Sequence, residues 1–298
     1  MPNVRSNFQR TMFPGIEEFI MDGFIRQKMP QYTLVFNIKS TTDAFREDLI
    51  GAGVGLPIRT GETEEAIEDQ FQVGPSKRYD WDKYTLMIGM SDEFIDDGKV
   101  NLWAERGPDM GFSFRQLLEI LHADVFDSGT TVNGFDGVPL FSAAHPNVRQ
   151  GTQSNLVTPA GTPSVVTMRL QLTKGRLYFD DTGVRRLDVM WEWCWHPPNY
   201  EYDVKEILKS SERPDTANRA TNVIHEAVKP LTWDYLQNTK NWGLLAGKAD
   251  HKLKSFDRKK FGVVPIADEK AGVQWVKGQL RNGRGYSHWR GVQVMAPT

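Results

Sequence analysis

The sequence predicts an α+β protein, in which amphipathic helices and strands follow one another along a chain of ordinary globular composition. The 298 residues are 39% hydrophobic and 25% charged, proportions typical of a protein with a substantial core. Leu117, Ile120, Leu121 and Val125 recur at the spacing of one helix face. Across residues 187–195, apolar and polar side chains alternate instead with the period of two that indicates a strand. A chain of this length usually divides into two compact lobes.

Membrane-spanning runs, secretory signals and cysteine pairs are the sequence features that indicate the cellular compartment of a protein. No apolar run approaches the roughly 20 residues that cross a bilayer, and the first residues lack the apolar core of a secretory signal, so we expect synthesis in the cytoplasm. The single cysteine, Cys194, lies in the apolar stretch VMWEWCWHPP, where a buried small hydrophobe is expected rather than a catalytic thiol. One cysteine forms no disulfide within the chain, which agrees with a reducing compartment.

Charge is segregated along the chain although the net charge is only -2. Residues 60–100 carry eleven acidic and four basic side chains, whereas residues 248–290 carry eleven basic and four acidic ones. Two interpretations stay open: two solvated faces, or an acidic segment of one subunit that meets the basic segment of another. The small net charge does not indicate a protein that binds nucleic acid tightly.

The first ninety residues predict an arm followed by an extended excursion. We expect residues 1–30 to form an arm with one short helix near Gly15–Gln27, whose apolar stripe needs a partner surface. A strand is predicted at 33–38. The glycines and glutamates that follow favour a hairpin-like excursion that returns through a strand at 79–90. The stripe of the arm helix consists of Ile16, Phe19, Ile20 and Phe24.

The rest of the chain predicts three helices and four strands. A helix is expected over 111–127, with Ser113 as a cap and Gly129 as a stop. The alternation over 187–195 predicts a central strand that buries its tryptophan face, and Pro198 fits the first turn of the helix after it. The other predicted elements are a helix over 164–178 with Val166, Leu170 and Leu177 along one side, a helix from Pro198 to about 210, and strands at 242–246, 272–282 and 288–295.

No motif in the sequence indicates catalysis or metal binding. Phosphate-binding and dinucleotide-binding glycine motifs, HExxH and CxxC are absent, and the six histidines lie without the short spacing of a metal site. The acidic cluster from Asp92 to Asp97 lacks the regular spacing of a calcium loop, so a solvated turn is the default. We therefore assign no catalytic, cofactor-binding or metal-binding residue.

Several segments together resemble one family. DGVPLFSAAHPN at 136–147 and GTQSNL at 151–156 resemble the Mu-like major head subunit family of tailed-bacteriophage capsid proteins. LDVMWEWCWHPPNYEYDVKEILKSS, TANRATN, WGLLAGKAD and HWRGVQVMAP follow in the family's order, from about residue 85 to the C-terminus, although residues 250–272 do not align. The positions that match the family's motifs are Asp136, Gly137, Leu140, Phe141, His145, Pro146, Trp289, Arg290 and Gly291.

The resemblance implies the Hong Kong 97-type capsid fold and a shell protein that encloses viral DNA. It implies pentamers and hexamers of the chain as the units of assembly, and scaffold, portal and other head proteins as partners. Contact with packaged DNA is expected to be weak and nonspecific, no membrane is involved, and the location is the virion, after assembly in the cytoplasm of a host bacterium. The implied divisions are an N-terminal arm (1–34), an extended loop (35–90), a peripheral domain with a spine helix (91–159 and 248–298) and an axial domain with a central sheet (160–247).

Two other functions remain as alternatives. An encapsulin-like cellular shell would share the fold but enclose enzymes, and would need an internal groove for its cargo. A soluble hydrolase would need an active site such as His145 with Asp136 as its acidic partner, although no nucleophile motif accompanies them.

Overall fold

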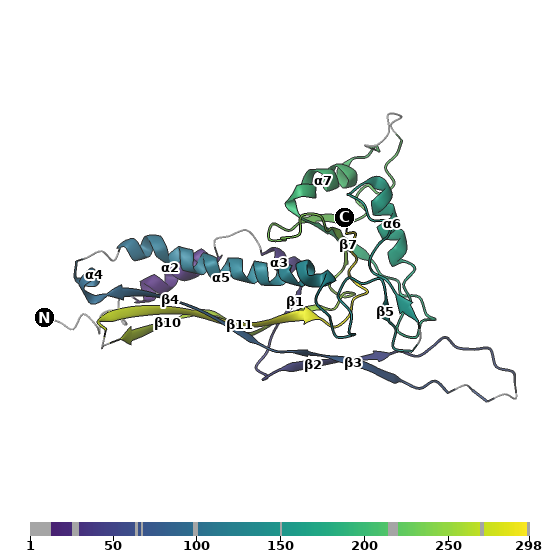
Figure 1. The fold of residues 1–298 in the computed structure, drawn as a ribbon, viewed down its shortest axis with the longest axis horizontal. Coiled ribbons are helices and arrows are strands. Elements are labelled where there is room, and N and C mark those ends of the chain that lie inside the picture. The colour runs from purple at the N-terminus through teal and green to yellow at the C-terminus, as the bar shows by residue number, and fades with distance from the viewer. Residues whose placement is uncertain are drawn as a thin grey trace.

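The protein is elongated, with an upright domain at one end of a long sheet. In the computed structural model, helices lie along this sheet and a narrow hairpin runs beyond the upright domain (Figure 1). Within the part of the chain described here, no helix combines the length and apolar character needed to cross a membrane. The structure describes residues 13–25, 30–62, 65–66, 68–97, 101–149, 151–213, 220–268 and 271–296.

The long sheet has four strands in the order β1-β10-β11-β4. The β1–β10 pair is parallel and the other two pairs are antiparallel. Side chains of β11 alternate between a buried face, which includes Val276 and Leu280, and a half-buried face, which includes Lys277 and Arg281. Such alternation is expected of a sheet covered on one side. The strands are β1 (Asn37–Ser40), β4 (Asp82–Ser91), β10 (Leu253–Asp268) and β11 (Val273–Tyr286).

Two helices, α2 (Phe13–Ile25) and α5 (Asn101–Asp127), cover one face of this sheet (Figure 1). They cross in close contact, because a Cβ atom on Gly23 would lie 2.2 Å from the carbonyl oxygen of Pro108, and one on Gly111 would lie 2.0 Å from that of Ile20. The helix predicted near Gly15–Gln27 is therefore confirmed for its described residues, and its stripe packs on the chain's own α5. Residues 1–12 and 26–29 of the predicted arm lie outside the described residues.

The hairpin consists of β2 (Arg46–Ala52) and β3 (Gln72–Tyr79), which pair antiparallel. Between residues 53 and 71 the described residues form no helix or strand. We call β2, β3 and the segment between them the extended hairpin. Six of its large apolar side chains are 54–66% exposed, so the rest of the chain leaves most of their surface uncovered. These side chains are Leu49, Val54, Leu56, Ile58, Phe71 and Val73.

The upright domain is built on a three-stranded sheet in the order β8-β7-β9. The central position predicted for the tryptophan strand is confirmed, but the strand is buried on both faces at its end, where Cys194 and Trp195 pack into different core clusters. Ser164 caps α6 with a capping box. The elements are α6 (Val165–Gly175), β7 (Trp191–His196), a 3-10 turn (Pro198–Tyr200), α7 (Glu201–Lys209), β8 (Lys229–Thr232) and β9 (Gly243–Ala246).

The segments between these parts contain short elements, and one of them directly follows the end of α5. The helix predicted over 111–127 ends where expected, but it begins at Asn101, and Ser113 lies inside it with its hydroxyl donating to the carbonyl of Asp109. The short elements are α4 (Asp92–Asp96), a 3-10 turn (Ser128–Thr130) that contains Gly129, and the pair of β5 (His145–Pro146) with β6 (Thr152–Gln153).

Two predicted strands near the start of the chain are wrong in part. The segment at 33–38 begins instead as a helix, α3 (Gln31–Val35), because the carboxylate of Glu119 accepts hydrogen bonds from the backbone N–H groups of Gln31 and Tyr32 at its N-terminus. The segment at 79–90 is not the returning strand of the hairpin. That strand is β3, whereas β4 pairs with β11 in the long sheet.

Three further differences concern the second half of the chain. The apolar side of α6 points outward, with Val166 57% exposed, because Met168 and Gln171 form the buried side. Residues 288–295 form isolated bridges rather than one strand, since they pack between other elements. Residues 250–272, for which the sequence predicted no element, contain β10, the long partner of β11.

Candidate functional site

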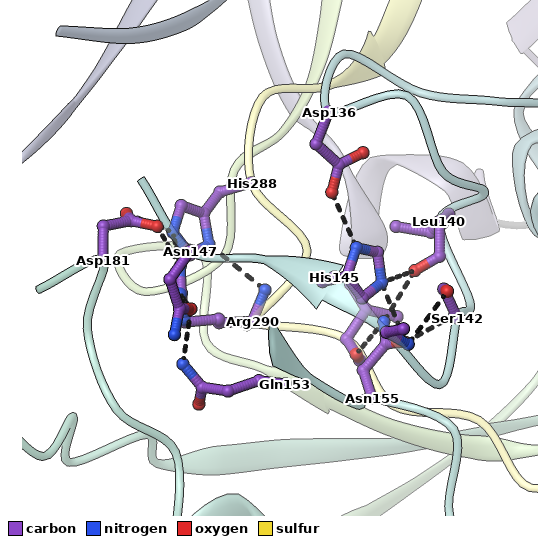
Figure 2. A network of polar contacts seen from close by, with 12 residues as sticks. Asp136, Leu140, Ser142, His145, Asn147, Gln153, Asn155, Asp181, His288 and Arg290 are labelled. Carbon is purple, nitrogen blue, oxygen red and sulfur yellow. Dashed lines mark hydrogen bonds and ion pairs between the residues drawn. The ribbon is translucent and has the colours of Figure 1, made fainter. Parts of the chain in front are cut away.

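The nine motif positions meet at the junction of the long sheet, the upright domain and the extended hairpin. They come from two segments that are far apart in the sequence, 136–146 and 289–291. The first begins with a tight turn, in which the N–H of Gly134 donates to the carbonyl of Val138 at 2.8 Å. Gly137 in this turn has a φ of 81°, which favours glycine over residues with a side chain. The turn directs Asp136 towards His145 (Figure 2).

His145 is the centre of a fully buried polar network. Its Nδ1 lies 2.7 Å from Oδ2 of Asp136, and the two side chains are 0% and 4% exposed. Its Nε2 lies 3.1 Å from the carbonyl oxygen of Leu140 and 3.2 Å from Oδ1 of Asn155. The Asn155 amide in turn donates to the carbonyls of Leu140 and Val292. Both ring nitrogens of His145 therefore face oxygen atoms that accept hydrogen bonds.

Trp289 joins the second motif segment to this network. Its ring stacks on that of His145, with centroids 4.4 Å apart and planes 10° apart. Tyr178 meets the Trp289 ring edge-on at 5.5 Å, and the guanidinium carbon of Arg290 lies 4.5 Å from the ring centroid. Aromatic stacking and a cation above the ring both favour this arrangement. The indole therefore separates two polar networks.

Arg290 is the centre of the second network (Figure 2). Its guanidinium donates to Oδ1 of Asp181 at 2.9 Å and to Oδ1 of Asn147 at 2.6 Å, and lies 2.8 Å from Nε2 of His288. Burial alone would raise the pKa of Asp181, but hydrogen bonding from His288 and the charge of Arg290 outweigh burial and lower it. Burial lowers the pKa of Arg290 and of His288, and Asp181 opposes both shifts.

The remaining motif residues shape the junction by packing. Leu140 and Phe141 are buried, and the Phe141 ring stacks on Trp195 with centroids 5.8 Å apart. Pro146 forms the short pair with Thr152. A Cβ atom on Gly291 would lie 2.5 Å from the Cβ of the buried His251, so only glycine fits there. All nine predicted positions therefore lie in one region, as side chains that support one another.

A cavity of about 430 Å³ separates these networks from the base of the extended hairpin. Ile50, Val73, Gly74 and Pro75 line it from the hairpin, and Asp136, Trp289 and Arg290 are among the residues that line it from the junction. Oδ1 of Asp136 and Nε of Arg290 are buried atoms without a hydrogen-bond partner. A Cβ on Gly74 would lie 2.7 Å from the Val148 side chain, which shows how closely the hairpin approaches the junction.

A second contact holds the hairpin farther along its length. Arg149 forms an ion pair with Asp69 at 2.7 Å and donates to the carbonyls of Gly53 and Gln70 at 3.2 and 2.8 Å. Asp69 also accepts from the N–H of Gly55. The hydrogen bond from Arg149 is the largest of the effects that lower the pKa of Asp69. One side chain thus joins both sides of the hairpin to the junction.

The geometry favours a structural role and gives no route to hydrolysis. His145 is completely buried, and its nitrogens face a carboxylate, a carbonyl and an amide oxygen rather than a nucleophile or a cleft. Sequence reasoning missed Asn147, Asp181 and His288 as partners of Arg290. Asn155 lies inside the quoted GTQSNL segment, but nothing in that segment distinguished it from its neighbours.

Comparison with solved structures defines the class of fold. The chain is similar to the procapsid of bacteriophage JBD30, with 13% identity, a TM-score of 0.53, and coverage of 100% of this chain and 76% of that one. It is also similar to Microbacterium phage Oxtober96 at 11% identity and a TM-score of 0.54, with 91% and 92% covered. A virus-like particle from Pyrococcus furiosus matches at 9% identity and a TM-score of 0.52, with 96% and 99% covered. This is the Hong Kong 97-type capsid fold.

The family is shown by a sequence model rather than by the fold. A model described as phage capsid protein matches residues 74–294, which is most of the chain, whereas no curated protein sequence matches. The chain belongs to the phage capsid protein family and is therefore a structural protein of a phage shell. The family match, rather than the fold, is what favours the phage capsid over an encapsulin-like shell.

Proposed function

We propose that this chain is the major head subunit of a Mu-like tailed bacteriophage, and that copies of it assemble as pentamers and hexamers into the shell that encloses the viral DNA. The resemblance of residues 136–156 and 288–297 supports the Mu-like assignment. The subunit is made and assembled in the cytoplasm of the host bacterium and ends in the virion. Scaffold, portal and other head proteins are its further partners.

The single observation that carries this proposal is the exposed apolar surface of the extended hairpin. The hairpin runs away from the body (Figure 1), and six large apolar side chains along it are more than half exposed. Ordering such a segment costs conformational entropy, which a monomer does not recover by burying it. A neighbouring subunit supplies the missing surface. Each subunit makes several modest contacts of this kind, and together they stabilise a closed shell.

Each of the four segments expected from the sequence is proposed to have its own role in assembly. The arm is 1–34 and the extended loop is 35–90, with β1 and β4 at its base paired into the long sheet. The peripheral domain is 91–159 with 248–298, and α5 is its spine helix. The axial domain, 160–247, holds the three-stranded sheet, and it forms the rings of five and six. The outward-facing Val166, Leu170 and Leu177 on and beside α6 support a contact there.

Contact with the packaged DNA is weak and nonspecific. The net charge of the chain is only -2, so the subunit as a whole does not attract a polyanion. Tight adhesion would also hinder release of the genome. The shell therefore acts as a container that is held together by its own interfaces.

Negative-stain electron microscopy combined with size-exclusion chromatography tests the proposal. The chain is expressed alone and together with its neighbouring head genes. Closed shells, or rings of five and six, are the expected result, and DNA inside the shells supports a phage head. Enzyme cargo in place of DNA would indicate the encapsulin-like alternative. A compact monomer under every condition would contradict the proposal.

A further inference from the structure

Three basic side chains lie directly opposite one another across three neighbouring strands of the long sheet. Arg281 on β11 is the partner of Lys83 on β4 and of Lys259 on β10. Directly opposed residues point to the same face of a sheet, where like charges repel and destabilise the pairing. We call Lys83, Arg281 and Lys259 the basic row. A row of three like charges in register is unfavourable unless an opposite charge covers it.

The basic row lies on the face of the sheet that α2 and α5 do not cover. Leu280 and Asn282, the neighbours of Arg281 in β11, are buried on the helix side, so the Arg281 side chain points the other way. Lys83 and Lys259 are exposed. Farther along β11 the same face carries Lys277, whose partners on the adjacent strands, Met87 and Val264, are 41% and 40% exposed. The uncovered face therefore combines positive charge with apolar surface.

Among the described residues, no carboxylate pairs with this row. Asp82 and Asp257 are the nearest in register, but both are partners of the buried Asn282 and so belong to the helix face. Asp257 accepts a hydrogen bond from Asn282 at 3.0 Å, and Asp82 lies 3.9 Å from Arg284. The buried Nε of Arg281 has no hydrogen-bond partner.

The complementary surface is at the far end of the extended hairpin. Glu62, Glu65 and Glu68 are exposed there, and we call them the acidic tip. The apolar side chains of Leu56 and Ile58 close to the tip are 54% and 66% exposed, so the tip has the same mixture of charge and apolar surface as the sheet face. Figure 1 shows that the hairpin runs away from the β4–β11–β10 sheet, so the tip does not cover the row of its own chain.

We propose that the basic row is the docking site for the acidic tip of a second copy of this chain. The proposal rests on the proposed function, because it assigns residues to the contact between a hairpin and a neighbouring subunit. Three strands at a spacing of about 4.8 Å place the row across about 10 Å, a width that suits one extended peptide segment. The flanking apolar residues favour such a peptide over a nucleic acid backbone, which offers charge alone at its phosphates.

Charge reversal and charge exchange test this docking site. The row variant is Lys83→Glu with Lys259→Glu, and the tip variant is Glu65→Lys with Glu68→Lys. The matched control reverses Arg106 and Lys252, which are exposed and lie outside the basic row and the axial domain. The row variant flanks Arg281 with opposite charges, so the fold of its subunit is retained, and circular dichroism verifies this for every variant.

The readout is the subunit concentration at which shells form at low salt, together with their nucleic acid content. The row and tip variants should each need about tenfold more protein to form shells, because several exposed ion pairs become repulsive. The variant that combines all four substitutions restores opposite charges, so its assembly concentration should lie within about threefold of that of the wild type. A combined variant that assembles as poorly as either parent would overturn the proposal. So would a row variant that assembles normally but holds less nucleic acid, because the row would then bind a polyanion. Failure of the wild type and the control to form any shell would overturn the proposed function itself.

Discussion

The imidazole of His145 stacks on the indole of Trp289, with ring centroids 4.4 Å apart and planes 10° apart. This contact joins two segments that are separated by more than a hundred residues. On one side of the indole, His145 pairs with Asp136, and on the other, Arg290 pairs with Asp181. The junction therefore connects the long sheet to the upright domain through polar contacts that are buried or largely buried.

Replacement of His145 by Ala should destabilise the subunit strongly. The change leaves the carboxylate of Asp136 buried without its partner and removes the ring from Trp289. Breaking a buried ion pair in this way costs about 3 kcal/mol of unfolding free energy. Urea unfolding of the variant and the wild type measures this loss of unfolding free energy. The control is His225→Ala at an exposed position, which should change the free energy by less than about 0.5 kcal/mol. Equal stability of the two variants would show that the junction is not a structural centre.

Subunit stability should fall as the pH is lowered from about 6.5 towards 4, because of buried histidines. Burial lowers the pKa of His122 to about 3 and that of His251 to about 4, from the ordinary 6.5. Between these pKa values and 6.5, the unfolded chain binds more protons than the folded one, so the unfolding free energy rises with pH. The contribution of these histidines to stability is therefore complete above pH 6.5. It is lost progressively as the pH falls through this window.

Unfolding free energies measured from pH 8 to pH 4 test this pH dependence. The variant His122→Gln should show a shallower slope than the wild type, since one of the groups that take up a proton on unfolding has been removed. His225→Ala serves again as the control and should keep the slope of the wild type. An unchanged slope in His122→Gln would contradict the assignment of His122 as a neutral buried ring.

Two glycine substitutions should have opposite effects on the arm helix. In Gly111→Ala the new Cβ would lie 2.0 Å from the carbonyl oxygen of Ile20, so α2 must move away from α5. Gly15→Ala, in α2 itself, meets no atom within 4 Å and should stabilise the helix by about 0.5–1 kcal/mol. Thermal unfolding and the rate of proteolysis within residues 13–25 measure both effects. A Gly111→Ala variant as stable as Gly15→Ala would mean that α2 does not pack on α5 in solution.

Arg149→Ala should release the extended hairpin from the junction. The change removes the ion pair with Asp69 and the two hydrogen bonds to backbone carbonyls. Cleavage by thermolysin at the apolar residues between 53 and 71 should become about fivefold faster in the unassembled subunit, because local opening is then easier. Arg169→Ala, at an exposed position on α6, should leave the rate unchanged. Equal cleavage rates in both variants would show that Arg149 does not hold the hairpin.

The local patterns predicted most helices and strands, and failed where distant residues decide the structure. The predicted helix starts at 111, whereas α5 starts at Asn101 and contains three residues of helix-breaking type, Gly107, Pro108 and Gly111. The structure keeps them helical, because two of these positions allow α2 to approach α5 closely. In the same way, Glu119 turns the predicted strand at 33–38 into the start of a helix, and nothing within that segment indicates this partner.

The sequence named the candidate residues but not the contacts between them. The family resemblance selected residues from two segments, and the structure brings all nine to one junction. The partners of Arg290, however, are Asp181, Asn147 and His288, and the first two lie 109 and 143 residues away in the sequence. No periodicity links such positions, because the contacts exist only once the upright domain has packed against the end of the long sheet.

Shell assembly is best tested by electron microscopy of the particles that form when the chain is expressed with its neighbouring head genes. We expect closed shells in which the extended hairpin of each subunit lies across a neighbouring subunit. A chain that stays monomeric under every condition, with its hairpin uncovered, would contradict it.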